Sequence, residues 1–201
     1  MVAIITGDII KSRNIEAKQW MPELKKVLNR YGNEPKTWEI YRGDSFQIEV
    51  KPEEALHAAI LIKAAIKQFK PLDVRLAIGI GEKTYHSEKI TESNGTAFIY
   101  SGESFESLKK QTLAIKTEWK DFNKTINLMF DLASLTMDNW TPISSLIIKT
   151  ALEAKPESNQ QELAAVLNKK QSNISTGLKR GGFYEIQKLI NYYQHEIKNK
   201  C

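Results

Sequence analysis

The spacing of apolar and polar positions predicts strands alternating with helices over the first 122 residues. Short apolar runs that end at Gly, Pro or Asp predict strands, and apolar residues three or four positions apart predict helices. The predicted strands are residues 2–6, 37–41, 45–50, 73–80 and 113–117. The predicted helices between them are residues 15–31, 53–69 and 102–111, with a polar loop over 87–94. This order matches a ferredoxin-like, palm-type α/β (α+β) fold.

Beyond residue 122 the apolar spacing is helical throughout. Leu128, Leu132 and Leu135 mark a helix that ends near Asn139. Further helices are predicted over residues 142–154, 160–167, 172–180 and 183–198, with Ser158 capping the second of these and Ser172 the third. We therefore expect a palm-like domain over residues 1–122, a helical connector over 123–140 and a helical domain over 141–201.

The composition favours a globular protein and argues against membrane-spanning and disulfide-bonded classes. The chain has 201 residues, of which 41% are apolar, enough to bury a core. Its longest apolar stretch, residues 55–66, contains His57 and Lys63 and is too short and too polar to span a bilayer. We expect no secretory signal, because the first apolar run lacks a basic leader. The single cysteine, Cys201, excludes an internal disulfide and a cysteine-based zinc site, so a cytoplasmic location is favoured.

Positive charge is concentrated in the last third of the chain. Residues 141–201 hold nine Lys and Arg against five Asp and Glu, a balance of +4, whereas the whole chain has +5. Clustered basic residues favour an anionic partner, and this asymmetry places that partner at the C-terminal helices.

Two aspartates at strand ends form the candidate metal site. Asp8 follows the first predicted strand and Asp44 lies on the turn between the next two. Carboxylates held close together repel each other, and Mg²⁺ accepts two of them together with phosphate oxygens and water. Arg13 and Arg42 lie near the aspartates in sequence and suit phosphates. Glycine before each aspartate lets the backbone approach a ligand. The alternative is ordinary turn chemistry, with Asp8 as a cap.

The segment 158–180 reads as a helix-turn-helix, with Leu163, Ala164, Leu167, Ile174 and Leu178 directed inward. Short polar side chains at the start of the second helix suit base edges, and flanking basic residues suit phosphates. These candidate DNA-binding residues are Lys169, Lys170, Gln171, Ser172, Asn173, Ser175, Thr176, Lys179 and Arg180. The segment resembles the helix-turn-helix of many bacterial regulators, so duplex DNA is the expected partner, and a homodimer would suit it. The alternative is a helical cap that dimerises or packs on the first domain.

Several motifs resemble the palm domain of class III nucleotidyl cyclases and diguanylate cyclases. They are residues 6–9 (Thr-Gly-Asp-Ile), 42–47 (Arg-Gly-Asp-Ser-Phe-Gln), 74–81 (Val-Arg-Leu-Ala-Ile-Gly-Ile-Gly) and 95–108, which contains Phe-Ile-Tyr-Ser-Gly. The whole chain is similar to the SatD family of bacterial proteins, on the landmarks 5–13, 41–46, 75–79 and 93–95.

The cyclase resemblance implies metal ligands at Asp8 and Asp44, with the Ile9 carbonyl as a further ligand, and a phosphate contact from Lys110. The chain departs from that pattern at other positions. Isoleucine stands at both expected base-reading positions, Ile40 and Ile99, and isoleucine cannot hydrogen-bond a base. Glu106 stands where the family has a phosphate-steadying Asn, and Ser45 stands where diguanylate cyclases have an acidic residue. The resemblance therefore implies a nucleotide site with absent or very slow purine cyclase activity.

Three functions remain open. The leading one is a cytoplasmic DNA-binding regulator of the SatD type whose palm domain binds Mg²⁺ and a nucleotide. The second is a divergent nucleotidyl cyclase or a related Mg²⁺-dependent phosphoryl-transfer enzyme. The third is a non-catalytic interaction scaffold.

Overall fold

The computed structural model describes residues 1–155 and 157–201. Within them the protein is a mixed α/β structure with one five-stranded sheet and eight α-helices. The strands are β1 (Val2–Ile10), β2 (Trp38–Tyr41), β3 (Ser45–Val50), β4 (Asp73–Gly81) and β5 (Leu113–Lys116). The helices are α1 (Ala17–Leu28), α2 (Ala55–Ile66), α3 (Thr96–Ser107), α4 (Lys120–Met137), α5 (Pro142–Glu153), α6 (Gln160–Val166), α7 (Gln171–Arg180) and α8 (Phe183–Lys198).

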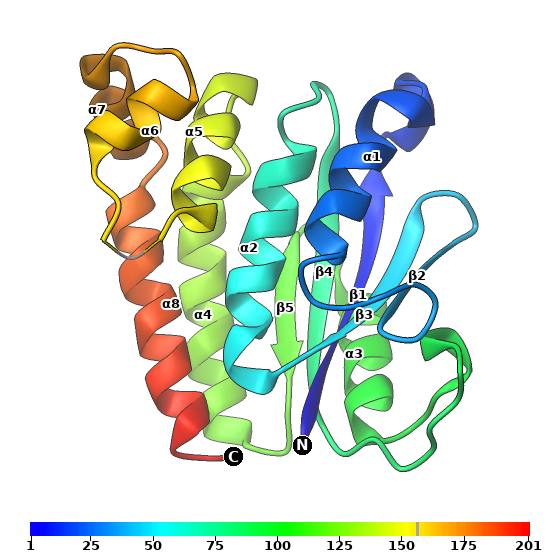
Figure 1. Cartoon of the computed structure of the whole chain (residues 1–201). Coiled ribbons are helices and arrows are strands. Elements are labelled where there is room, and N and C mark those ends of the chain that lie inside the picture. Colours follow the sequence, from blue (N-terminus) through cyan, green and yellow to red (C-terminus); the bar gives the residue numbers. More distant parts are fainter. Residues whose placement is uncertain (156) are drawn as a thin grey trace.

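The strands lie in the order β2-β3-β1-β4-β5 (Figure 1). β1 is central and antiparallel to both β3 and β4, whereas β5 runs parallel to β4. β1 is longer than its apolar run predicted, because its ladder to β3 and β4 continues past Gly7. The expectation that Asp8 follows the strand is therefore wrong, since Asp8 lies within it.

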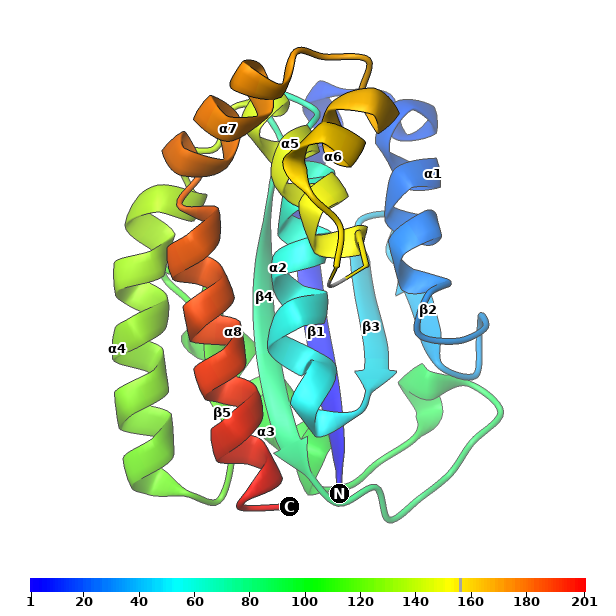
Figure 2. The ribbon, with the colours of Figure 1, turned by 60° about the vertical axis from the view of Figure 1, so that its left-hand side comes forward.

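Helices cover both faces of the sheet (Figures 1 and 2). α1 and α2 lie on one face and α3 lies on the other, while α4, α5 and α8 continue the helical layer beyond the β5 edge. α3 begins six residues earlier than the predicted helix, at Thr96 rather than 102. A Cβ at Gly79 of β4 would lie 2.2 Å from the Ala97 carbonyl oxygen, so α3 packs with its backbone directly on the strand.

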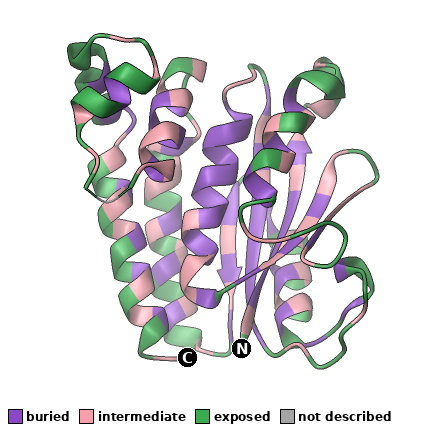
Figure 3. Ribbon diagram, viewed as in Figure 1, coloured by how far each residue is buried: buried purple, intermediate pink, exposed green. Residues whose placement is uncertain are grey.

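Most of the buried residues form one cluster from β1 through α8 (Figure 3), and a second, small cluster of Ile4, Ile90 and Ala97 lies on the α3 side of the sheet. Tyr193 of α8 is wholly buried and its hydroxyl donates to the Pro52 carbonyl before α2, at 2.8 Å. Lys149 of α5 pairs with Glu23 of α1 at 2.9 Å and with Glu153 at 2.7 Å. Burial opposes the charge on Lys149, but hydrogen bonds to the two glutamates outweigh it and raise its pKa.

The division of the chain into domains at residues 122 and 140 stays a prediction.

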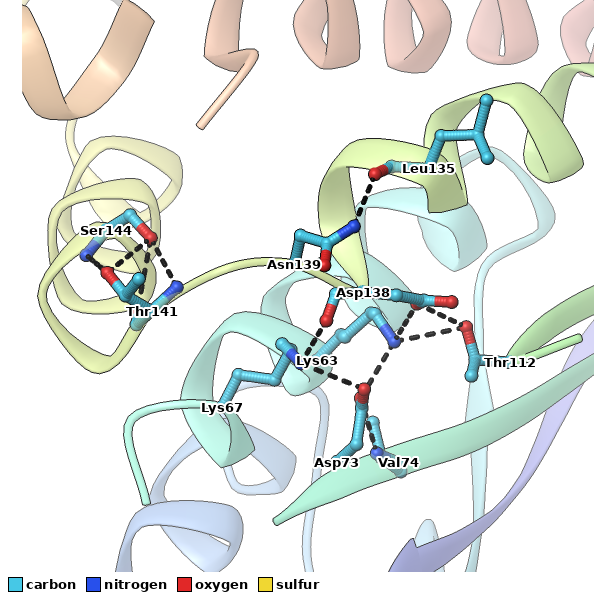
Figure 4. Close-up of polar contacts among 10 residues, drawn as sticks. All are labelled: Lys63, Lys67, Asp73, Val74, Thr112, Leu135, Asp138, Asn139, Thr141 and Ser144. Carbon is cyan, nitrogen blue, oxygen red and sulfur yellow. Dashed lines mark hydrogen bonds and ion pairs between the residues drawn. The ribbon is translucent and has the colours of Figure 1, made fainter. Parts of the chain in front are cut away.

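A buried ionic cluster joins the end of α4 to α2 and the sheet (Figure 4). Lys63, whose side chain is 1% exposed, lies 2.8 Å from both Asp73 and Asp138. Lys67 lies 2.9 Å from Asp73 and donates to the Asp138 carbonyl at 2.7 Å. Thr112 donates to the Asp138 carboxylate at 2.7 Å. Two cations and two carboxylates thus neutralise one another at the point where the chain leaves α4.

Two of the predicted helix caps are wrong. Asn159, not Ser158, caps α6, because its side chain accepts from the backbone N–H groups of Gln161 and Glu162. α7 begins at Gln171, one residue before Ser172, and its N-cap Lys170 makes no side-chain cap bond. The opening of α5 at Thr141-Pro142 is confirmed by a capping box.

The leucine spacing of α4 predicted a helix correctly, but these leucines are not its buried face. Leu128 and Leu132 are each 61% exposed, and Leu135 is 72% exposed. The core instead receives Phe122, Ile126, Phe130 and Met137 from the other side of the helix.

None of the helices in the described residues combines the length and the hydropathy that a membrane crossing requires.

Candidate functional site

A row of four polar side chains crosses the sheet. Tyr41 of β2 lies opposite Ser45 of β3. Ser45 in turn lies opposite Asp8 of β1, and Asp8 lies opposite Arg75 of β4. Directly opposed residues in antiparallel strands project to the same face of a sheet. Register alone therefore brings these side chains together from four strands.

α3 covers the face to which this row points. Thr6, two positions before Asp8, shares a hydrogen bond of 2.6 Å with Ser101 of α3. The guanidinium of Arg75 lies 5.3 Å from the centre of the Phe105 ring, also on α3. The Asp8 row therefore lies beside α3, and the aromatic ring supports the arginine.

Asp8 is neutralised by a neighbour rather than left free. Arg75 Nη2 lies 2.7 Å from Asp8 Oδ2, with the two side chains 36% and 21% exposed. Ser45 Oγ donates to Asp8 Oδ1 at 3.5 Å, a long contact. Arg75 stands in one of the sequence motifs, but its role could not be predicted from the sequence, because only the β1–β4 register shows that it opposes Asp8.

The β2–β3 hairpin places Asp44 beside the end of β1, close to Asp8. The Ile9 N–H donates to the Asp44 carbonyl at 3.1 Å, so Asp44 adjoins the residue after Asp8. Asp44 Oδ2 accepts from Ser12 Oγ at 2.6 Å. A strand residue directs its N–H and C=O to the same side, so the Ile9 carbonyl also faces the hairpin.

The glycines before the two aspartates have different roles. A Cβ at Gly7 would lie 2.2 Å from the Phe46 ring, on the sheet face opposite to Asp8. Gly43 has φ +86° and nothing within 4 Å of its Cβ position, so it serves the turn. The expectation that Gly7 lets the backbone approach a ligand is therefore replaced by a packing reason.

The three predicted phosphate-binding residues surround this end of the sheet. Arg13 lies in the short 3₁₀ helix Ser12–Asn14, beside the Ser12 that binds Asp44. Arg42 lies in the hairpin turn with φ 53°, and its side chain is exposed. Lys110 is exposed in the loop between α3 and β5, and Thr112 of that loop accepts from the Leu76 N–H, next to Arg75. Their roles stay predictions.

Tyr41 completes the row at its β2 end. Burial raises the pKa of Tyr41, and the charge of Asp8 raises it further while Arg42 opposes both. A phenol whose pKa is raised remains protonated at neutral pH, so the Tyr41 hydroxyl can serve as a hydrogen-bond donor.

The oxygen atoms of Asp8, Asp44 and the Ile9 carbonyl are of the chemical type that Mg²⁺ prefers as ligands. Two carboxylates and one backbone carbonyl are hard oxygen ligands. In the described residues no group of three or more His, Cys, Asp or Glu side chains is arranged to hold a metal ion. A cation at Asp8 and Asp44 would therefore complete its coordination with phosphate oxygens and water. The guanidinium of Arg75 already stands at Asp8 as a cation.

The two isoleucines at the positions where the cyclase resemblance led us to expect base-reading residues lie in different surroundings. Ile40 packs against the main core on the α1–α2 side of the sheet. Ile99 is 51% exposed on α3. They do not meet at the Asp8 row, so they form no joint base-binding pair there.

α7 carries the predicted DNA-binding residues on its outer surface. Ile174 and Leu178 are buried, at 0% and 2% exposure, as predicted from their spacing. A Cβ at Gly177 would lie 2.4 Å from Ile147 of α5, so the two helices are in close contact. Trp140 Nε1 donates to the Gly181 carbonyl at 2.8 Å and fixes the end of α7.

All but one of the predicted DNA-binding residues are exposed on α7 or on the turn before it. They are Lys170, Gln171, Ser172, Asn173, Ser175, Thr176, Lys179 and Arg180, with Lys169 half-buried. Gln171 also donates to the Gln160 side chain of α6 at 3.3 Å. α6 and α7 lie at the end of the molecule opposite to both termini (Figures 1 and 2).

A large apolar groove lies away from Asp8, between α4, α7 and α8. Its volume is about 990 Å³, and its walls include Leu132, Leu189 and Tyr192. Lys179 and Lys188 also line it. The groove continues the exposed leucine face of α4 toward α7.

Comparison with known proteins supplies the family. No curated protein matches the chain. Residues 1–189 match the SatD family, which is nearly the whole sequence. The chain belongs to the SatD family.

Proposed function

We propose that this protein is a cytoplasmic DNA-binding regulator in which α6 and α7 act as a helix-turn-helix. The observation that carries the proposal is the two-sided character of α7. Its apolar residues are buried against α5, whereas its polar residues are exposed from the first turn onward. A helix held in this way can enter a major groove, with short polar side chains at base edges.

The charge distribution supports duplex DNA as the partner. Lys169 and Lys170 precede α7, and Lys179 and Arg180 end it, so cations lie at both ends of the exposed polar surface. Phosphates on either side of a groove would meet such cations.

The proposal also assigns the sheet a ligand site for Mg²⁺ and a nucleotide. The strand order β2-β3-β1-β4, with α1 and α2 on one face, supports the palm-type interpretation. Asp8 and Asp44 would hold the cation with the Ile9 carbonyl, and Arg13, Arg42 and Lys110 would contact phosphates.

The DNA part is tested by fluorescence anisotropy with labelled genomic duplexes at several salt concentrations. Affinity should fall steeply with salt, and Lys170→Ala should reduce the slope of log affinity against log salt by about 1. Lys198→Ala removes the same charge from the other end of α8 and should leave the slope unchanged. Asn173→Ala should change the preference between sequences rather than the slope. Folded protein that binds no duplex at low salt would refute this function.

Because Asp8 and Asp44 are neighbours, an enzymatic function is the alternative. The enzyme would be a divergent nucleotidyl cyclase or a related Mg²⁺-dependent enzyme. The placement of Ile40 and Ile99 argues against purine turnover. Cyclic nucleotide formed from ATP or GTP at about 1 s⁻¹ or faster would favour that alternative over the regulator.

A further inference from the structure

Three exposed leucines form a ridge on α4 beside the apolar groove. Leu128, Leu132 and Leu135 are spaced by four and three residues, which aligns them on one side of the helix at 61%, 61% and 72% exposure. Leu132 also lines the groove between α4, α7 and α8, so the ridge and the groove are neighbours across the width of α4. A continuous apolar surface of this kind marks a contact with another protein surface.

The ridge and the groove carry opposite charge. The only charged side chain along the ridge, between Leu128 and Leu135, is the exposed Asp131. The charged residues that line the groove are three cations and one acid, namely Lys179, Arg180, Lys188 and Glu185. The groove therefore suits an apolar ridge with an acidic flank, and the ridge of a second copy of this chain offers both.

The side-by-side position of ridge and groove decides how two copies would pair. In a two-fold contact each copy presents the same surface, and the axis lies in the plane of the contact. An axis across α4 lays each ridge on the partner's ridge and leaves both grooves empty. An axis along α4 exchanges the two sides of the helix, so each ridge faces the partner's groove.

The same axis places both α7 helices at one end of the dimer. α4 begins beside the C-terminus, where Lys200 Nζ lies 5.9 Å from the centre of the Trp119 ring. It ends beside α7, where Trp140 donates to the Gly181 carbonyl (Figures 1 and 2). An axis along α4 keeps these ends together in the two copies. Paired half-sites about 34 Å apart on one duplex require this placement.

We infer that two copies of this chain pair around a two-fold axis along α4, with the ridge of each copy seated in the groove of the other. The contact is self-complementary, because each copy supplies one ridge and one groove and every contact occurs twice. The placement of the two α7 helices on one duplex rests on the proposed function, whereas the ridge and the groove do not depend on it.

The test mixes a ridge variant with a groove variant. Leu128→Glu alters the ridge, and Tyr192→Glu alters the groove at a side chain that is 39% exposed. Each variant alone damages both contacts of its dimer and should raise the dissociation constant at least about 100-fold, as two contacts of about tenfold each. An equal mixture leaves one contact intact, so the mixed dimer should be weaker than the wild type by only about tenfold. Sedimentation velocity measures all three constants.

Controls separate the contact from folding. Val166→Glu changes a side chain of α6 that is 73% exposed and lies outside the ridge and the groove, so it should dimerise like the wild type. Circular dichroism checks that each variant is folded. Lys188→Glu, also in the groove and exposed, replaces Tyr192→Glu if the latter unfolds.

Each outcome decides the inference. Dimers in the mixture but not in either variant alone support it. A groove variant that stays dimeric while the ridge variant does not places ridge on ridge and overturns it. A mixture that stays monomeric or a monomeric wild type also overturns it. Duplex binding by a monomeric wild type would leave the regulator in place, whereas a mixed dimer with no duplex binding by the wild type would refute the regulator and keep the contact.

Discussion

At the scale of single residues, His57 of α2 contacts α5 and the turn after α1 through its ring. Nε2 lies 3.2 Å from the Leu152 carbonyl and Nδ1 lies 3.3 Å from the Tyr31 hydroxyl. A neutral ring can donate to the carbonyl and accept from the hydroxyl. Burial lowers the pKa of His57 below its ordinary 6.5, and Arg30 lowers it further, against the opposing effect of the Leu152 carbonyl.

This lowered pKa predicts a loss of stability in mild acid. The unfolded chain takes up a proton at His57 near pH 6.5, before the folded protein does. The free energy of unfolding is therefore fully retained above pH 6.5 and falls as the pH decreases toward the folded pKa. His57→Gln should remove this part of the slope, measured by urea unfolding between about pH 5 and pH 7. The exposed His86→Gln is the control, and an unchanged slope in His57→Gln would contradict the prediction.

A second prediction at this scale concerns Gly7. Its Cβ position lies 2.2 Å from the Phe46 ring, which is itself fully buried. Gly7→Ala should therefore lower the free energy of unfolding by about 1–3 kcal/mol through overpacking. Gly102→Ala in α3 has nothing within 4 Å and should stabilise by about 0.5–1 kcal/mol through helix propensity. Thermal and denaturant unfolding distinguish the two, and equal effects would refute the packing reason for Gly7.

At the scale of elements, the cluster of Lys63, Lys67, Asp73 and Asp138 fixes α4 to α2 and β4. Asp73→Ala removes the carboxylate that both lysines share and leaves buried positive charge. We expect a loss of about 3 kcal/mol in the free energy of unfolding, measured in urea. Asp131→Ala, on the exposed side of α4, is the matched control and should change stability by less than about 0.5 kcal/mol. A loss no larger than that of the control would mean that the cluster contributes little.

At the scale of the whole molecule, the exposed leucines of α4 need an explanation. Leu128, Leu132 and Leu135 form one stripe at 61%, 61% and 72% exposure, next to the apolar groove beside α7. Helix-turn-helix proteins commonly bind paired half-sites as dimers, so the proposed function predicts that a second copy covers this stripe. Sedimentation should show a dimer for the wild type and a monomer for Leu132→Glu. Ile99→Glu, on the exposed side of α3, should remain dimeric, and a monomeric wild type would contradict the prediction.

Local sequence determined most of the elements and part of the site. The hairpin strands, the last helix and the inward residues Ile174 and Leu178 follow from periodicity, because each depends only on neighbours a few positions away. The position of Asp44 on the turn between β2 and β3 was likewise predicted from the glycine-aspartate step between two short apolar runs.

Tertiary structure decided the features that depend on distant residues. The register between β1 and β4 makes Arg75 the partner of Asp8, and strand pairing also carries β1 past its apolar run. Which side of α4 is buried depends on its packing against β5 and α8. The spacing of residues within α4 therefore does not indicate that its leucines are exposed. Lys63 is buried because two carboxylates from β4 and the end of α4 arrive beside it. Periodicity is a local property, whereas register, facing and charge pairing arise from contacts between segments far apart in the chain.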